Sequence, residues 1–195
     1  MVRRIGPIDR ISVKLVMIFL IIGSLLLFFT NLGGRDFWAP DEGDFAQIVK
    51  ELDTDPVVPH LNNVPYGEKP PLFYYVVYIF AKTFRSLPDE TSMRLSSSFA
   101  ALITLIAFFL TIRVGFGLSR SIASVVILGL TPLFYWQARY LQVDMVFSAA
   151  LVLALLAFFR FIENARTGWY YAFFIMLACA FMTKGPLAAV LAVPV

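Results

Sequence analysis

Residues 15–34, LVMIFLIIGSLLLFFTNLGG, form an apolar stretch without a single charged side chain. A helix needs about 20 mostly apolar residues to cross the roughly 30 Å hydrocarbon core of a bilayer. This run is too long for the core of a secretory signal, and no small-residue cleavage site follows it. It therefore predicts a retained membrane span.

The composition of the whole chain points the same way. Of its 195 residues, 59% are hydrophobic and 15% are charged, against about 45–50% and about 25% in soluble proteins. Disordered, collagen-like, coiled-coil and disulfide-rich proteins each need a composition that this chain lacks. The net charge of +3 is too small and too scattered to suggest a nucleic-acid partner. Cys179 is the lone cysteine, so no intramolecular disulfide can form.

Further uncharged runs predict a polytopic all-α transmembrane helix bundle. The predicted spans are 15–34, 95–112, 121–138, 143–161 and 167–183, with a sixth that starts at 187 and is still running at Val195. The fourth reaches spanning length if Asp144 and Arg160 lie at the two interfaces.

Lysine and arginine near the spans predict the orientation. The N-terminal tail carries Arg3, Arg4, Arg10 and Lys14, which places it in the cytoplasm and the acidic loop 35–94 outside. Two short helices are expected on the outer membrane surface within this loop, at about 41–53 and 72–84. If the second were a span instead, every later loop would change sides.

The first of these helices begins with acidic residues. Phe45, Ile48, Val49 and Leu52 recur at helical spacing and predict one apolar face, which we expect on the membrane surface. Asp41 stands at the start of this helix. It either caps the helix by accepting bonds from its first N–H groups, or takes part in chemistry together with its neighbours.

Three further polar features border the outer side. Pro70 and Pro71 disfavour helix and hold Glu68 and Lys69 in a stiff extended segment, which suits an anionic headgroup or an exposed ion pair. Asp144 lies at the outer end of a span, with Arg139 as its expected partner. Lys184 lies between two apolar runs, where snorkelling to the interface would also account for it.

A shared outer face for these residues suits chemistry on a lipid-linked phosphate. A carboxylate can take a proton from an acceptor hydroxyl while a lysine or arginine stabilises the departing phosphate. The sequence contains no phosphate-loop or dinucleotide fingerprint, and no Ser-His or Cys-His pair stands out. A divalent cation bound through Glu68, Asp41 or His60 stays open, although no ligand spacing supports it.

Four motifs carry a resemblance to a known family. They are DFWAPDEGDFA at 36–46, VPHLNNVPYGEKPPL at 58–72, YLQVD at 140–144 and TKGP at 183–186. They resemble bacterial membrane glycosyltransferases of the GT-C fold, related to undecaprenyl-phosphate aminoarabinose transferase and to protein O-mannosyltransferases. The resemblance covers nearly all of the chain and implies a GT-C helix bundle.

The resemblance implies transfer of a sugar, with inversion, from a polyprenyl-phosphate donor to a lipid, glycan or protein acceptor on the outer face of the inner membrane. Asp41 matches the essential first-loop acid, with Glu42 beside it, and Asp144 matches a second acid. Lys69 matches the group that neutralises the leaving phosphate, with Glu68 as a positioning or metal ligand. Arg139 and Lys184 are the weaker matches for donor-phosphate contacts.

This chain departs from the family in its length. Family members run well beyond twice this size, so we expect an N-terminal portion of a longer enzyme that is inactive alone. A transport or flippase component for lipid-linked sugars is the alternative. A transporter would place ionisable groups near the middle of its spans, whereas here they lie at the outer ends.

Overall fold

The computed structural model describes the backbone of residues 7–192 and side chains from residue 13 onward. Arg3 and Arg4, the side chain of Arg10, and Val195 therefore lie outside the described residues. In chain order the elements are α1 (Pro7–Phe28), α2 (Asp41–Glu51), β1 (His60–Leu61), β2 (Val64–Pro65), α3 (Leu72–Thr83), α4 (Asp89–Phe116), α5 (Leu118–Leu130), α6 (Pro132–Ala138), α7 (Val143–Asn164), α8 (Thr167–Lys184) and α9 (Leu187–Ala192). The all-α prediction is confirmed, since the two strands, β1 and β2, have only two residues each and form a short antiparallel hairpin.

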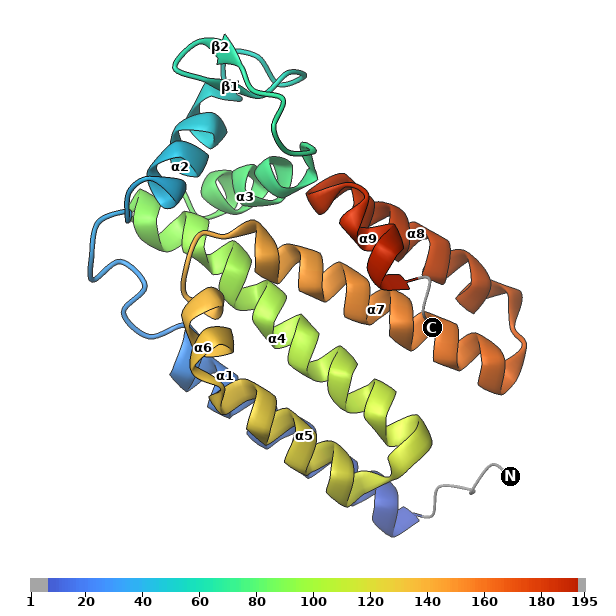
Figure 1. The fold of residues 1–195 in the computed structure, drawn as a ribbon. Coiled ribbons are helices and arrows are strands. Elements are labelled where there is room, and N and C mark those ends of the chain that lie inside the picture. Colours follow the sequence, from blue (N-terminus) through green and yellow to red (C-terminus); the bar gives the residue numbers. More distant parts are fainter. Residues whose placement is uncertain (1–6, 193–195) are drawn as a thin grey trace.

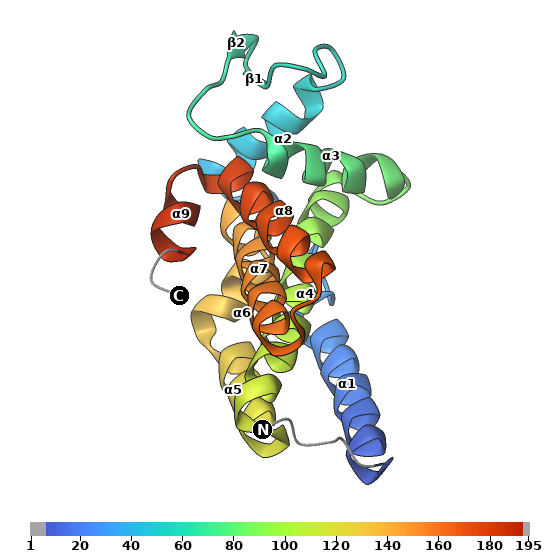
Figure 2. The same ribbon diagram turned by 90° about the vertical axis from the view of Figure 1, so that its right-hand side faces the viewer.

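The long helices form a bundle with α4 and α7 at its centre. Helix α7 packs against α4 on one side and α8 on the other, while α1 and α5 lie against α4 (Figure 1). The view turned by 90° shows α2, β1, β2 and α3 as a cap across one end of this bundle (Figure 2). We call these four elements and their connections, residues 35–87, the polar cap.

Two described helices, α4 and α7, are long and apolar enough to cross a membrane, and α5 and α6 add a third crossing if the bent pair is one span. The sequence predicts more spans than these. The predicted span 15–34 is helical only to Phe28, and 121–138 divides into α5 and α6, which are bent by 69°. Pro132 has no N–H and disfavours helix at the residue before it, and Thr131 is accordingly extended, with φ −64° and ψ 126°.

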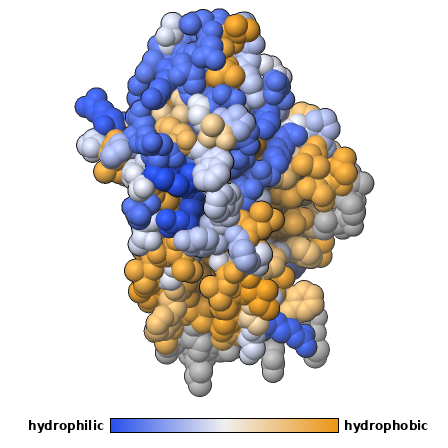
Figure 3. Space-filling view, turned by 60° about the vertical axis from the view of Figure 1, so that its left-hand side comes forward, coloured by the Kyte–Doolittle hydropathy of each residue, from blue (hydrophilic) through white to orange (hydrophobic). Residues whose placement is uncertain are grey.

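The bundle has two chemically different ends. Helix α3 lies across the top of the bundle, and the turns at 113–120 and 160–166 lie at the end opposite the polar cap (Figure 1). Asp144 and Lys184, at the start of α7 and the end of α8, lie at the capped end. Hydrophilic surface gathers over the cap and hydrophobic surface over the helices below it (Figure 3).

The apolar face of α2 is buried within the protein. Phe45, Ile48 and Val49 are at most 3% exposed. The Phe45 ring lies 5.3 Å from that of Phe73 on α3 in an edge-to-face arrangement. The sequence pattern identifies this face correctly, but it packs on α3, not on a membrane surface, because α3 supplies the apolar cover.

Candidate functional site

Glu42 and Arg94 form an ion pair in which both side chains are fully buried. The Nε and Nη2 atoms of Arg94 donate to the two carboxylate oxygens of Glu42, each at 2.8 Å. Burial raises the pKa of Glu42, but these bonds, backbone bonds and the positive charge of Arg94 outweigh it, so the pKa is lowered. Glu42 is therefore ionised and fully engaged at neutral pH.

This pair ties distant segments of the chain together. The backbone N–H groups of Trp38 and Leu141 donate to Glu42 at 2.9 and 2.7 Å. Arg94 also donates to the carbonyl oxygens of Leu32, Arg35 and Asp36. The loop before α2 and the turn between α6 and α7 are thus both held by one buried pair.

Glu42 therefore differs from its predicted role. A carboxylate with both oxygens occupied by guanidinium and backbone donors, and with no exposed surface, has no room for a substrate hydroxyl. Its partner Arg94 was not among the predicted site residues, because the sequence treats it as a flank of the apolar run 95–112. A charged side chain followed by Ser96, Ser97 and Ser98 at the start of an apolar helix is the signal that could have found it.

Asp41 precedes Glu42 but faces the surface. Pro40 occupies the N-cap position of α2, and no side-chain capping bond is present there. The capping interpretation of Asp41 is therefore wrong for this structure. Instead, its Oδ2 accepts a hydrogen bond from Nε2 of Gln142 at 3.2 Å. Gln142 is the residue before α7, so Asp41 lies against the segment that carries Asp144.

Asp144 pairs with Lys184, from the end of α8. The sequence suggested Arg139 as the partner of Asp144, but the Nη1 of Arg139 instead donates to the carbonyl oxygen of Leu27 at 2.9 Å. The side chains of Asp144 and Lys184 remain 42% and 24% exposed. This ion pair is therefore open to a ligand, unlike the one between Glu42 and Arg94.

Lys69 and Lys184 line one cavity of about 520 Å³. Its lining residues are Pro59, Tyr66, Gly67, Glu68, Lys69, Pro70, Pro71, Lys184, Gly185 and Pro186. We call it the lysine cavity. The Nζ atom of Lys69 lies 5.1 Å from the centre of the Phe45 ring, which is one helical turn beyond Asp41. The structure thus brings Lys184 to Glu68 and Lys69, although it comes from a distant part of the sequence.

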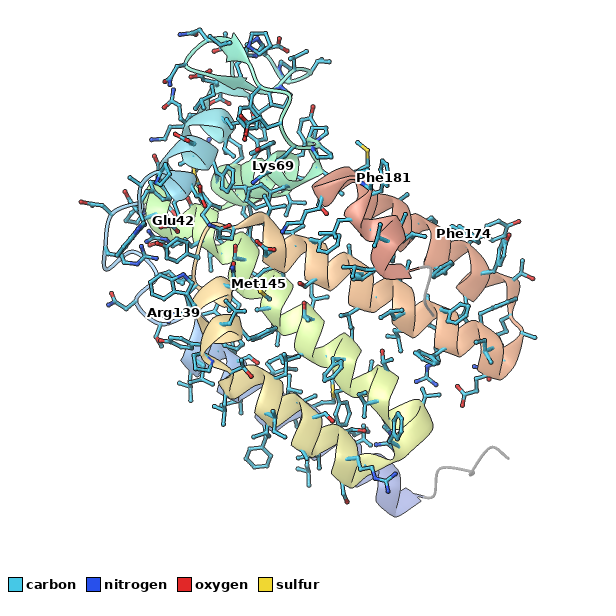
Figure 4. All side chains as sticks on the ribbon, viewed as in Figure 1. Glu42, Lys69, Arg139, Met145, Phe174 and Phe181 are labelled. Atoms are coloured by element: carbon cyan, nitrogen blue, oxygen red, sulfur yellow. The ribbon has the colours of Figure 1, made fainter. Side chains whose placement is uncertain are left out.

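Arg139 lies elsewhere, at the end of α6 and apart from Lys69 (Figure 4). It lines a second cavity of about 270 Å³ together with Asn31, Leu32, Gly34, Arg35, Tyr135, Trp136 and Tyr140. We call it the arginine cavity. The two cavities share no lining residue, so Arg139 does not join the two lysines.

The described residues do not fit a metal centre. No three His, Cys, Asp or Glu side chains converge within them. The Oε2 of Glu68 accepts a hydrogen bond from the Tyr66 hydroxyl at 3.1 Å. His60 instead lies near Asp55. Within the described residues, Glu68 thus has no companion ligands for a metal ion.

The lysine cavity can bind an anion, and a carboxylate at the same end of the bundle can accept a proton. Two lysines from one cavity suit a phosphate, since each ammonium group supplies three donors. Asp41 accepts a bond from Gln142, and Asp144 follows Gln142 by two residues in the first turn of α7, at the same capped end. The arrangement can thus separate charge between an activated hydroxyl and a leaving phosphate.

Comparison with known sequences finds a family and several relatives. The sequence model of the family described as dolichyl-phosphate-mannose-protein mannosyltransferase matches residues 68–195. An undecaprenyl phosphate-alpha-4-amino-4-deoxy-L-arabinose arabinosyl transferase of Shewanella sediminis is 32% identical over 88% of this chain and 32% of the relative. A second such transferase, from Sodalis glossinidius, is 30% identical over 87% of this chain and 32% of the relative.

Comparison with solved structures finds a protein whose fold is similar to that of this chain. ArnT from Cupriavidus metallidurans, solved bound to undecaprenyl phosphate, superposes with a TM-score of 0.81 at 24% identity, over 89% of this chain and 33% of that one. The apo structure of the same protein gives a TM-score of 0.81 at 23% identity, over 94% and 35%. The chain spans about a third of the length of these relatives.

Proposed function

Because this chain belongs to the dolichyl-phosphate-mannose-protein mannosyltransferase family, a family of membrane glycosyltransferases, we propose that its polar cap carries the donor side of a sugar-transfer site. The reaction is transfer of a sugar from polyprenyl phosphate to an acceptor hydroxyl or amine of a lipid, glycan or protein, with inversion. The lysine cavity is the observation that carries this proposal, because it joins Lys69 and Lys184 at the end of an apolar bundle.

Lys69 and Lys184 neutralise the donor phosphate as it leaves. The acceptor oxygen forms a bond to the anomeric carbon of the sugar while the bond from that carbon to the phosphate oxygen breaks. The electron pair of the broken bond stays on the phosphate, whose growing charge the two ammonium groups stabilise. Glu68 positions the segment that carries Lys69, through its contact with Tyr66. The relatives named for undecaprenyl phosphate use a donor of this chemical class.

Asp41 accepts the proton of the acceptor. It is exposed at the first residue of α2, and the one described hydrogen bond to its carboxylate comes from an amide that an incoming hydroxyl can displace. Asp144 holds Lys184 in place as its ion-pair partner, so it positions a donor contact and is not a second base. Glu42 is a positioning residue that fixes the loop in front of Asp41 through Arg94.

The chain is a membrane protein by family and by its apolar helices. For its orientation we propose a cytoplasmic N-terminus and a polar cap on the outer, periplasmic side of the inner membrane. The basic N-terminal tail supports this orientation. The turns at 113–120 and 160–166, which also carry arginines, lie at the end opposite the cap. If a cysteine introduced at Leu118 reacts with a label added to the outside of the membrane and not with one added to the cytoplasmic side, the proposed orientation is wrong.

Transfer of a radiolabelled sugar from its polyprenyl phosphate, measured in membranes that carry the full-length protein, tests the proposed function. Asp41→Asn and Lys69→Ala are each expected to lower the transfer rate about 100-fold or more, because each removes a group used in the transition state. Lys50→Ala and Asp89→Asn are matched controls, since these two residues form a surface ion pair outside the cavity. Unchanged transfer in the first two variants contradicts the proposal.

The same membranes separate transfer from transport. A flippase or transporter would move the lipid-linked sugar across the bilayer without breaking its bond to phosphate. Release of polyprenyl phosphate that depends on Asp41 is expected here. Translocation of intact donor that does not depend on Asp41 would favour transport instead.

A further inference from the structure

The arginine cavity lies on the side of the bundle where the loop after α1 meets α6. None of its lining residues, all in the described part of the chain, is acidic. Two of them, Arg35 and Arg139, are arginines that approach it from different elements. The cavity therefore combines positive charge with an absence of the carboxylates that the proposed transfer reaction needs.

The positive charge at this cavity is not neutralised by its surroundings. Arg35 and the buried Arg94 share the single carboxylate of Glu42, with the Arg35 Nη1 at 3.1 Å from Oε2. Arg139 donates one hydrogen bond, from Nη1 to the carbonyl oxygen of Leu27. A guanidinium group has five N–H donors in a planar fork, so both arginines retain donors for an anion.

Aromatic side chains surround these arginines as they do at a membrane interface. The Tyr140 ring lies 4.4 Å from the guanidinium of Arg35 and stacks on Trp136, with centroids 4.8 Å apart. Trp38 and Trp136 remain 58% and 49% exposed. Exposed tryptophan and tyrosine at the boundary between polar and apolar surface are typical of the lipid headgroup level. Figure 3 brings this side of the molecule forward and shows polar surface above apolar surface.

An apolar groove lies between the helices and comes close to the cavity at Leu27. It has a volume of about 350 Å³ between α1, α4 and α5, and its lining is almost entirely apolar. Leu27 joins the two: its carbonyl oxygen accepts from Arg139, and its side chain lines the groove. Gly23 and Gly129 also line the groove and leave space along α1 and α5. A charged head and an apolar chain can therefore be bound side by side.

We infer that the arginine cavity and this groove bind an anionic membrane phospholipid, with its phosphate between Arg35 and Arg139 and an acyl chain in the groove. This site is separate from the lysine cavity and does not depend on the proposed transfer reaction. The occupant is a membrane phospholipid, because the cavity places two cations next to an apolar groove. The exposed tryptophans support a lipid surface over a soluble anion.

Native mass spectrometry of the protein in detergent tests this inference, with phosphatidylglycerol and phosphatidylcholine added in equal amounts. The protein is expected to retain phosphatidylglycerol in preference to phosphatidylcholine. Arg139→Gln is expected to lower the retention of phosphatidylglycerol about tenfold, because a charge-assisted bond to the phosphate is lost. Arg120→Gln, at the exposed start of α5 on the opposite end, is the matched control and should change nothing.

A second variant tests the groove without touching the charges. A Cβ at Gly23 meets no atom within 4 Å, so the side chain of Gly23→Leu starts in open space beside the groove that Gly23 lines. It is expected to lower retention of phosphatidylglycerol to a similar extent. Gly168→Leu is its control, since that Cβ is equally free and Gly168 lies at the start of α8, away from the groove.

Three results would overturn the inference. Equal retention of the two phospholipids would mean that the arginines select nothing. Unchanged retention in Arg139→Gln and Gly23→Leu would place the lipid elsewhere. Displacement of phosphatidylglycerol by undecaprenyl phosphate at equal concentration, with both lost in Arg139→Gln, would make this the donor site.

Discussion

Two ion pairs in this molecule have the same chemistry and opposite surroundings. Glu42 and Arg94 are fully buried and bonded to backbone on several sides, whereas Asp144 and Lys184 are 42% and 24% exposed beside a cavity. A buried charge is tolerated only where its bonds are complete, and completed bonds leave nothing for a ligand. Burial thus separates the pair that holds the loops together from the pair that stays open to a ligand.

Removal of Arg94 is expected to have the largest effect. Arg94→Met leaves the buried Glu42 with only the part-exposed Arg35 as a cationic partner, and breaking one side of a buried pair costs about 3–5 kcal/mol. Thermal unfolding in detergent should show a large fall in the transition temperature, or no folded protein at all. A variant that unfolds at the wild-type temperature would show that the buried pair does not stabilise the fold.

Lys184→Ala should separate activity from stability. The pair with Asp144 is part-exposed, so its loss is expected to cost less than about 1 kcal/mol of unfolding free energy. The transfer rate, in contrast, should fall about 100-fold, because a donor-phosphate contact is lost. Rates and unfolding temperatures measured on the same preparation check both. A loss of stability as large as that of Arg94→Met would erase the contrast between the pairs.

The acid dependence of stability should reveal the buried pair. The pKa of Glu42 is lowered from 4.5, so the folded state binds its proton more weakly than the unfolded state does. Its stabilising contribution is complete above pH 4.5 and is lost as the pH falls through the lowered pKa. Unfolding temperatures between pH 3 and 7 should therefore fall steeply below about pH 4.5. Glu42→Gln should flatten that fall, and an identical pH profile in this variant would contradict the assignment.

The smallest effect is expected at a fully surface pair. Lys50 and Asp89 are about half exposed and 2.8 Å apart. Lys50→Ala should change the unfolding free energy by no more than about 0.5 kcal/mol and leave transfer unchanged. Chemical denaturation in mixed micelles measures the change in unfolding free energy. A loss comparable to that in Lys184→Ala would mean that exposure does not rank these pairs.

The sequence predicts the helical part of this fold well because spans and amphipathic faces are local patterns. Spacing alone identifies the buried face of α2 through Phe45, Ile48 and Val49. The break between α5 and α6 was foreseeable from Pro132 but was masked by the continuous apolar run around it. What covers the face of α2 was not predictable, since that depends on how α3 folds back.

The site was predictable in its residues more than in its contacts. Glu68, Lys69 and Lys184 were all predicted, and the structure places them in one cavity. Their grouping, and the pairing of Asp144 with Lys184 in place of Arg139, follow from how α7 packs on α8 and are not local properties. Arg94 was missed because its partner is 52 residues away.

The neighbours Asp41 and Glu42 allow the most direct test of the central claim, that exposed groups carry the chemistry and the buried pair maintains its geometry. Transfer rate and unfolding temperature would be measured on the same preparations of Asp41→Asn and Glu42→Gln. Asp41→Asn is expected to unfold like wild type and to lose transfer about 100-fold, whereas Glu42→Gln should unfold at a clearly lower temperature. A stable Glu42→Gln without transfer, together with an active Asp41→Asn, would contradict it.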